Sequence, residues 1–172
     1  LGLARIEMTT GDRASARRHL NEAERILDRR TPQGLPLAEA LTTLGEYYLD
    51  GEDPALARPP LARAAEIVAR MPPGTTLEAR PLYLMSRVER TAGDLRKAGE
   101  LLAQALDALE SQRALLGRSD NTHVQFSERY APYYLDYIDL LVELGEPEQA
   151  FTVLERYRAR ALLDAFLSRS EV

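Results

Sequence analysis

The side chains that most often carry enzyme chemistry are few in this sequence. His19 and His123 are the only histidines, and neither belongs to a cluster spaced as metal ligands usually are. Cysteine is absent, which excludes disulfides, thiolate metal sites and a cysteine nucleophile. Carboxylate pairs such as Glu22 and Glu24 are common on solvated helix faces, so we assign them no acid–base role. Gly-x-Gly, the core of many phosphate-binding loops, occurs nowhere. The sequence therefore predicts no catalytic constellation, no metal site and no cofactor.

Arginines and one tyrosine form the clearest candidate binding feature. Arg80, Tyr83, Arg87 and Arg90 follow one another at spacings of 3, 4 and 3 residues, which places them on one stripe of a helix. Such a stripe could bind an acidic segment or a C-terminal carboxylate, because guanidinium groups make paired hydrogen bonds with carboxylates. The alternative is a solvated face whose arginines pair with glutamates of the preceding helix pair.

An aromatic band near the C-terminal end is a second candidate. Tyr130, Tyr133, Tyr134 and Tyr137 recur at spacings of three and four residues. We interpret the band as packing between helices, and the alternative is an aromatic ligand box.

Composition limits the partners that these residues could meet. The chain has 172 residues, 45% of them hydrophobic, and a formal net charge of -5 with acidic and basic residues interspersed. We expect no nucleic-acid partner, because phosphates require clustered lysine and arginine. The sequence has no run of eighteen apolar residues and no signal-peptide pattern, so we expect no membrane partner and a cytoplasmic location. Because the chain begins at Leu1 within a predicted helix, we expect it to be part of a larger protein.

An internal repeat organises the chain. Four turn phrases, containing Gly-Asp, Asp-Pro or Gly-Glu-Pro, are each followed by alanine and leucine at helical spacing, with the marker alanines Ala16, Ala57, Ala98 and Ala150. These alanines are separated by 41, 41 and 52 residues. The turn glycine would end one helix in the left-handed conformation, and the carboxylate would cap the next helix. The alanines would let the two helices of a pair approach closely.

We predict one all-α repeat domain of four units, each a helix pair. Clusters of proline and glycine separate the first three units. The units span residues 1–31, 36–71, 76–117 and 124–169, and the helices span residues 1–10, 12–30, 36–50, 54–71, 76–92, 95–117, 124–144 and 147–169.

The second unit resembles the tetratricopeptide repeat (TPR) family. The pattern of that family, Leu-Gly-x-x-Tyr on the first helix and Ala and Leu on the second, is matched by Leu44, Gly45, Tyr48, Ala57 and Leu61. Leu41 stands where the family usually has tryptophan, and the period is 41 residues, against about 34 in the family. HEAT or armadillo repeats, whose periods are of this length, are the alternative. The resemblance implies a right-handed α-solenoid that binds a protein or peptide.

In a TPR stack the first helix of each pair faces a concave groove, so the resemblance also implies where a partner would bind. The implied positions are Arg5, Thr42, Glu46, Arg80, Tyr83, Arg87, Arg90, Leu135 and Asp139, with Met8, Glu39, Leu49 and Val142 beside them. The expected partner is a protein or peptide with an acidic or C-terminal carboxylate, or the protein's own downstream domain.

Residues 134–166 resemble the helix pair that precedes a CHAT domain in bacterial proteins. The phrase from Glu155 to Asp164, in which arginines alternate with alanine and leucine, carries most of this likeness. CHAT domains are similar to caspase-like peptidases, so the resemblance implies that this chain positions an effector domain beyond Val172. One alternative is a substrate-recognition or regulatory segment of such a cysteine peptidase. The other is a structural spacer or self-association module.

Overall fold

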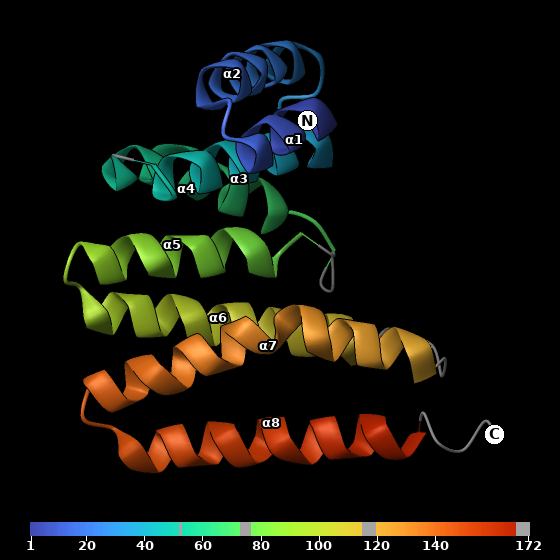
Figure 1. The fold of residues 1–172 in the computed structure, drawn as a ribbon, viewed down its shortest axis with the longest axis vertical. Helices are drawn as coiled ribbons and strands as arrows, with labels where there is room; N and C mark the ends of the chain where they lie inside the picture. The colour runs from blue at the N-terminus through green and yellow to red at the C-terminus, as the bar shows by residue number, and fades with distance from the viewer. Residues whose placement is uncertain (52, 73–76, 115–119, 168–172) are drawn as a thin grey trace.

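Helices make up nearly all of the computed structural model, which describes residues 1–51, 53–72, 77–114 and 120–167. In chain order, the described part contains α1 (Gly2–Thr10), α2 (Arg13–Arg30), α3 (Leu35–Leu49), the 3₁₀ helix η1 (Pro54–Ala57), α4 (Arg58–Val68), α5 (Ala79–Thr91), α6 (Leu95–Ala114), α7 (Asp120–Glu143) and α8 (Pro147–Leu167). They form four consecutive pairs, α1/α2, α3/α4, α5/α6 and α7/α8, stacked from one end of the molecule to the other (Figure 1). The predicted all-α architecture is confirmed.

Prolines divide the fourth predicted helix, which was expected over residues 54–71. It begins as η1, where the amide of Arg58 bonds the carbonyl of Ala55, and continues as α4. Pro59 and Pro60 have no N–H, so they cannot donate to the carbonyls four residues back as a continuous α-helix requires. The α-helical part ends at Val68, three residues early. The seventh helix also differs, because α7 begins at residue 120 rather than 124.

The turns within three of the pairs have the predicted geometry. Gly11, Gly93 and Gly145 adopt positive φ angles of 84°, 86° and 75°, respectively. Glycine reaches this region without the penalty that a Cβ would impose. The aspartates after the first two glycines each accept a hydrogen bond from the amide three residues on, at 3.1 Å in both cases. Each carboxylate thus satisfies an amide that the first turn of the next helix would leave free.

The marker alanines are buried where the helices of a pair meet. Ala16, Ala57 and Ala98 have 0% of their surface exposed. Gly45 on α3 permits an even closer approach, because a Cβ at this position would lie 2.4 Å from Cγ of Leu61 on α4. The glycine of the TPR-like pattern is therefore required by the contact between these two helices.

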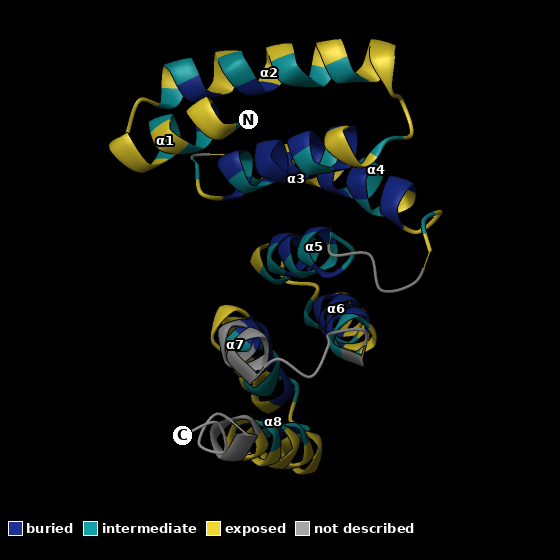
Figure 2. Cartoon of the chain, turned by 90° about the vertical axis from the view of Figure 1, so that its right-hand side faces the viewer, coloured by how far each residue is buried: buried dark blue, intermediate teal, exposed yellow. Residues whose placement is uncertain are grey.

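The hydrophobic core continues along the stack because neighbouring clusters share side chains. Tyr48 packs against the cluster of α1, α2 and α3 and also against the cluster formed by α3, η1, α4 and α5. Tyr83 joins that second cluster to the one built from α5, α6 and α7. Figure 2 shows the buried residues on the helix faces that meet inside the stack. The helix axes rotate along it, since α2, α3 and α4 lie across that view and α5 to α8 are seen nearly end on.

Candidate binding groove lined by arginine and tyrosine

Polar side chains connect α1, α3, α5 and α7, the first helices of the four pairs. On α5, Arg80 forms an ion pair with Glu46 of α3, and Arg87 lies 3.4 Å from Asp50, which follows the last residue of α3. Both arginines therefore pair with carboxylates of the preceding unit, as in the alternative interpretation of the arginine stripe.

Arg90 pairs in the opposite direction, with α7. Its Nε donates to Glu143 at 3.2 Å, and its guanidinium lies 3.9 Å from Asp139. The hydrogen bond to Glu143 raises the pKa of Arg90 above its usual value. The Asp139 side chain is 80% exposed, and Leu135 on the same helix is also exposed.

Tyr83 links α5 to α7 by ring stacking and by a hydrogen bond. Its ring centroid lies 3.9 Å from that of Tyr133, and its hydroxyl donates to Asp136 at 2.7 Å. Burial, with the hydrogen bond to Asp136, raises the pKa of Tyr83, and burial raises the pKa of Tyr133 to about 12. Both phenols therefore stay protonated near neutral pH.

One hollow collects residues from all four first helices, and we call it the first-helix groove. It has a volume of about 390 Å³ and is lined by Arg5 of α1, Glu39 of α3, Leu77 before α5, Arg80 of α5, and Arg129, Tyr130 and Tyr133 of α7. Because α1 and α7, far apart in the chain, line the same hollow, the face formed by the first helices curves inward.

Several donors in the first-helix groove have no acceptor within the described part of the chain. Arg5 donates to Glu39 at 3.0 Å, but its Nε is buried without a hydrogen-bond partner. Arg129 lies 5.8 Å from the centroid of the Tyr130 ring and forms no ion pair with a described residue. The hydroxyls of Tyr130 and Tyr133 likewise make no hydrogen bond to a described residue. The groove thus offers cationic and hydroxyl donors to an incoming acceptor.

The tyrosine band also packs the fourth pair, as predicted. Tyr130, Tyr133 and Tyr134 are buried. The ring of Tyr134 stacks against Tyr157 of α8, with centroids 5.3 Å apart, and its hydroxyl donates to Glu110 of α6 at 2.5 Å. One face of the band therefore serves the core, while two of its members border the groove.

Comparisons with known proteins bear on the fold. No family model and no curated protein sequence matches the chain. Among solved structures, a match is a variant of a Podosopora anserina protein described as a kinesin light chain with nearly identical TPR-like repeats. It aligns over 92% of this chain and 91% of that chain with a TM-score of 0.58 and 16% identity. A second structure of that protein aligns over 98% of this chain and 91% of its own, with a TM-score of 0.57 and 16% identity. The chain folds as a TPR-like repeat solenoid.

At this identity the likeness shows the fold alone. Within the described residues, no group of three or more histidines or carboxylates could hold a metal ion. None of the helices described is both long and apolar enough to cross a membrane. His19 links α2 to α1, with Nδ1 2.8 Å from a carboxylate oxygen of Glu7. The side chain of His123 lies outside the described part.

The first-helix groove of the TPR-like solenoid contains only some of the predicted site residues. Arg5 and Arg80 line it, and Glu46 borders it through its ion pair with Arg80. Thr42 is 4% exposed and its hydroxyl donates to the carbonyl of Ala38 in its own helix, so it offers no group to the groove. The remaining predicted residues, Tyr83, Arg87, Arg90, Leu135 and Asp139, are not part of the groove lining.

Sequence reasoning did not find Arg129 and Leu77, and it favoured packing over an aromatic ligand box for Tyr130 and Tyr133. The signal that could have found Arg129 is its position one turn before Tyr133. The 52-residue interval before the fourth unit departs from the 41-residue repeat. The groove-facing positions inferred by alignment with the other units therefore do not apply to α7.

Proposed function

We propose that this TPR-like solenoid is a protein-interaction scaffold that binds an acidic segment of a protein partner in the first-helix groove. The observation that carries the proposal is the gathering of unsatisfied donors in that groove. They are Arg129, which forms no ion pair with a described residue, the buried Nε of Arg5, and the hydroxyls of Tyr130 and Tyr133. The Nε of Arg5 is the donor among them that is buried without a partner, which costs free energy, and a bound carboxylate would remove that cost.

Arg129 is the residue that we expect to contribute most to binding. Arg5 and Arg80 already hold Glu39 and Glu46, so a ligand would have to share them. Arg129 has no such competitor among the described residues. A carboxylate at Arg129 would accept charge-assisted hydrogen bonds, which are stronger than those between neutral groups. Tyr133 stays neutral because burial raises its pKa, so its hydroxyl remains a donor to the same anion.

Fluorescence anisotropy with labelled peptides tests the proposal. The probes are a short peptide rich in Asp and Glu with a free C-terminal carboxylate, its Asn and Gln counterpart, and a C-terminally amidated form of the acidic peptide. We expect the acidic peptide to bind more tightly than its neutral counterpart. Arg129→Ala should weaken binding of the acidic peptide about tenfold or more, given about 1.5–3 kcal/mol for a hydrogen bond to a charged group.

Arg96→Ala is the matched control for this test. Arg96 is exposed on α6, lies outside the first-helix groove and forms no ion pair with a described residue. Its substitution removes the same charge and should leave the affinity unchanged. Equal affinity for the acidic and neutral peptides, or equal losses from the Arg129 and Arg96 substitutions, would contradict the proposal. Loss of affinity on amidation would identify the C-terminal carboxylate as the group bound.

We further propose that the scaffold positions an effector domain of its parent protein. Support comes from α8, where Phe151, Leu162 and Leu163 are 62%, 59% and 55% exposed. Leu162 and Leu163 are adjacent in the chain, and exposed apolar side chains that lie together favour contact with another segment. On the CHAT resemblance, that segment belongs to a caspase-like cysteine peptidase, and this chain would regulate it or recognise its substrate.

Sequencing the parent gene for a downstream His and Cys at caspase-like spacing tests this alternative. Further repeats in their place would reject it. If neither peptide binds the first-helix groove, the spacer or self-association role becomes the better explanation.

A further inference from the structure

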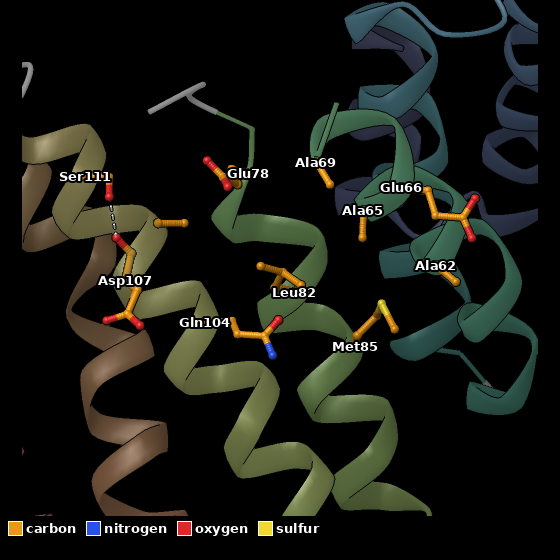
Figure 3. Close-up of a pocket in the computed structure, with 11 residues that line it drawn as sticks. Ala62, Ala65, Glu66, Ala69, Glu78, Leu82, Met85, Gln104, Asp107 and Ser111 are labelled. Atoms are coloured by element: carbon orange, nitrogen blue, oxygen red, sulfur yellow. Dashed lines mark hydrogen bonds between the residues drawn. The ribbon is translucent and has the colours of Figure 1, made fainter. Parts of the chain in front are cut away.

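A second groove lies among α4, α5 and α6, formed by a different set of residues from the first-helix groove. It has a volume of about 640 Å³. Ala62 and Ala65 of α4, with Ala69 just after its end, line one wall, and Gln104, Asp107, Ala108 and Ser111 of α6 line the other. Leu82 and Met85 of α5 form the floor between these walls (Figure 3). We call it the α4–α6 groove.

The floor of the α4–α6 groove is apolar, and the wall on the α4 side consists mainly of small apolar side chains. Alanine on α4 lets another backbone approach closely, as the small residues between paired helices do elsewhere in the stack. Leu82 and Met85 are only partly buried, so they keep apolar surface that a partner could cover. Methionine adapts its shape to different partners because its side chain is unbranched and flexible.

Carboxylates surround this apolar floor. Glu66 stands on the α4 side, Asp107 on the α6 side, and Glu78 at the end where α5 begins (Figure 3). None of the three forms an ion pair with a described residue, and no lysine or arginine is among the described residues that line the groove. The face of the first helices differs, because its carboxylates Glu39, Glu46, Asp50, Asp136 and Glu143 each contact an arginine or a tyrosine.

We propose that the α4–α6 groove binds a basic amphipathic helix of another protein. The charge of the occupant follows from these three carboxylates, which form no ion pair with a described residue. They lie on both sides of the apolar floor and favour lysine or arginine on both flanks of an apolar stripe. A helical conformation follows from the backbone of the groove. Helices α4, α5 and α6 use their amides and carbonyls internally, so an extended peptide would find no main-chain partners there, whereas a helix satisfies its own backbone.

The length of the groove sets the length of the contact. From Ala62 on α4 to Ala69, the residue after its end, a rise of about 1.5 Å per residue gives roughly 10 Å, or about two helical turns. The partner would therefore present a short stripe of apolar residues at spacings of three and four, with the basic residues beside it.

Two designed helical peptides test this proposal by isothermal titration calorimetry with the whole chain. One carries a Leu/Ala stripe flanked by lysines, and the other carries the same stripe flanked by glutamates. We expect the lysine peptide to bind and the glutamate peptide not to bind. The double variant E66K/D107K should weaken binding of the lysine peptide about tenfold or more, because it replaces two attractions with two repulsions. Ala65→Gln should also weaken binding of the lysine peptide without changing the charge, because it places a larger, polar side chain on the apolar wall.

The double variant E128K/E148K is the matched control, with the same change in net charge. Both residues are exposed, and neither lines the α4–α6 groove or forms an ion pair with a described residue. This variant should bind the lysine peptide as the unmodified chain does. The proposal fails if both double variants lose the same affinity, or if the two peptides bind equally. It also fails if sedimentation velocity shows self-association that E66K/D107K abolishes while the lysine peptide does not bind, because the occupant would then be a second copy of the chain.

Discussion

A buried carboxylate on α5 gives the most direct test of how the stack is held together. The side chain of Glu89 is only 3% exposed. Arg58, the first residue of α4, donates to its two oxygens at 2.5 Å and 2.8 Å, and Lys97 of α6 lies 3.2 Å away. Arg58 and Lys97 are themselves 44% and 48% exposed. Water can therefore hydrate either cation if Glu89 is neutralised, but it cannot reach Glu89 equally well if Arg58 is lost.

This asymmetry predicts an order of effects on the free energy of unfolding. Arg58→Ala should lower it by about 3 kcal/mol, because a buried carboxylate is left with one cation. Glu89→Gln should lower it by about 2 kcal/mol, since hydrogen bonds to a charged group contribute about 1.5–3 kcal/mol and the half-exposed cations recover hydration. Lys97→Ala should lower it by less than about 1 kcal/mol, because it removes a single, partly exposed ion pair.

Urea unfolding followed by far-UV circular dichroism measures these differences. Glu100→Gln, at an exposed position on α6, is the control and should leave the free energy of unfolding unchanged. The reasoning is refuted if Glu89→Gln matches this control, or if Lys97→Ala costs as much as Arg58→Ala. Added salt should change the Glu89 effect little, because ions screen buried charges less than exposed ones.

Three further predictions use the same unfolding assay. Gly45→Ala should lower the free energy of unfolding by about 1–3 kcal/mol, since its Cβ would overlap Leu61, whereas Gly2→Ala, with no atom within 4 Å of the new Cβ, should not. Asp94→Ala should lower it by about 1 kcal/mol by removing the cap of α6, and Asp94→Asn should largely preserve it. For Tyr133, burial raises the folded pKa to about 12, against about 10 when unfolded. The unfolded chain therefore releases this proton first, so stability should decline as pH rises from about 10 to 12, and Tyr133→Phe should reduce the decline.

The parts of the fold that could be predicted depend on residues close together in the chain. A glycine followed by an aspartate forms the same turn wherever it ends a helix, as at Gly11 and Gly93. Alanine and leucine at helical spacing identify the buried stripe without knowledge of the partner helix. The division of the fourth helix was also visible in principle, because Pro59 and Pro60 lack the amides that the α-helix needs.

The parts that could not be predicted depend on contacts across the stack. In the sequence, Glu89 resembles any other glutamate beside an arginine, and its burial follows from Arg58, 31 residues earlier in the chain. Arg129 lines the first-helix groove in a unit that departs from the 41-residue interval, so the repeat did not point to it. The pairing of Arg80 with Glu46, rather than with a ligand, likewise depends on the distance between α3 and α5.

The sharing of Tyr48 and Tyr83 between neighbouring core clusters determines how the molecule should come apart. A repeat protein behaves as a row of units coupled through their interfaces. Each of these rings is packed in two adjacent clusters. Unfolding one unit therefore removes side-chain contacts from the next unit and destabilises it in turn. We therefore expect one cooperative melting transition instead of separate steps. A peptide held in the first-helix groove contacts helices from every unit, so it should raise the stability of all four together.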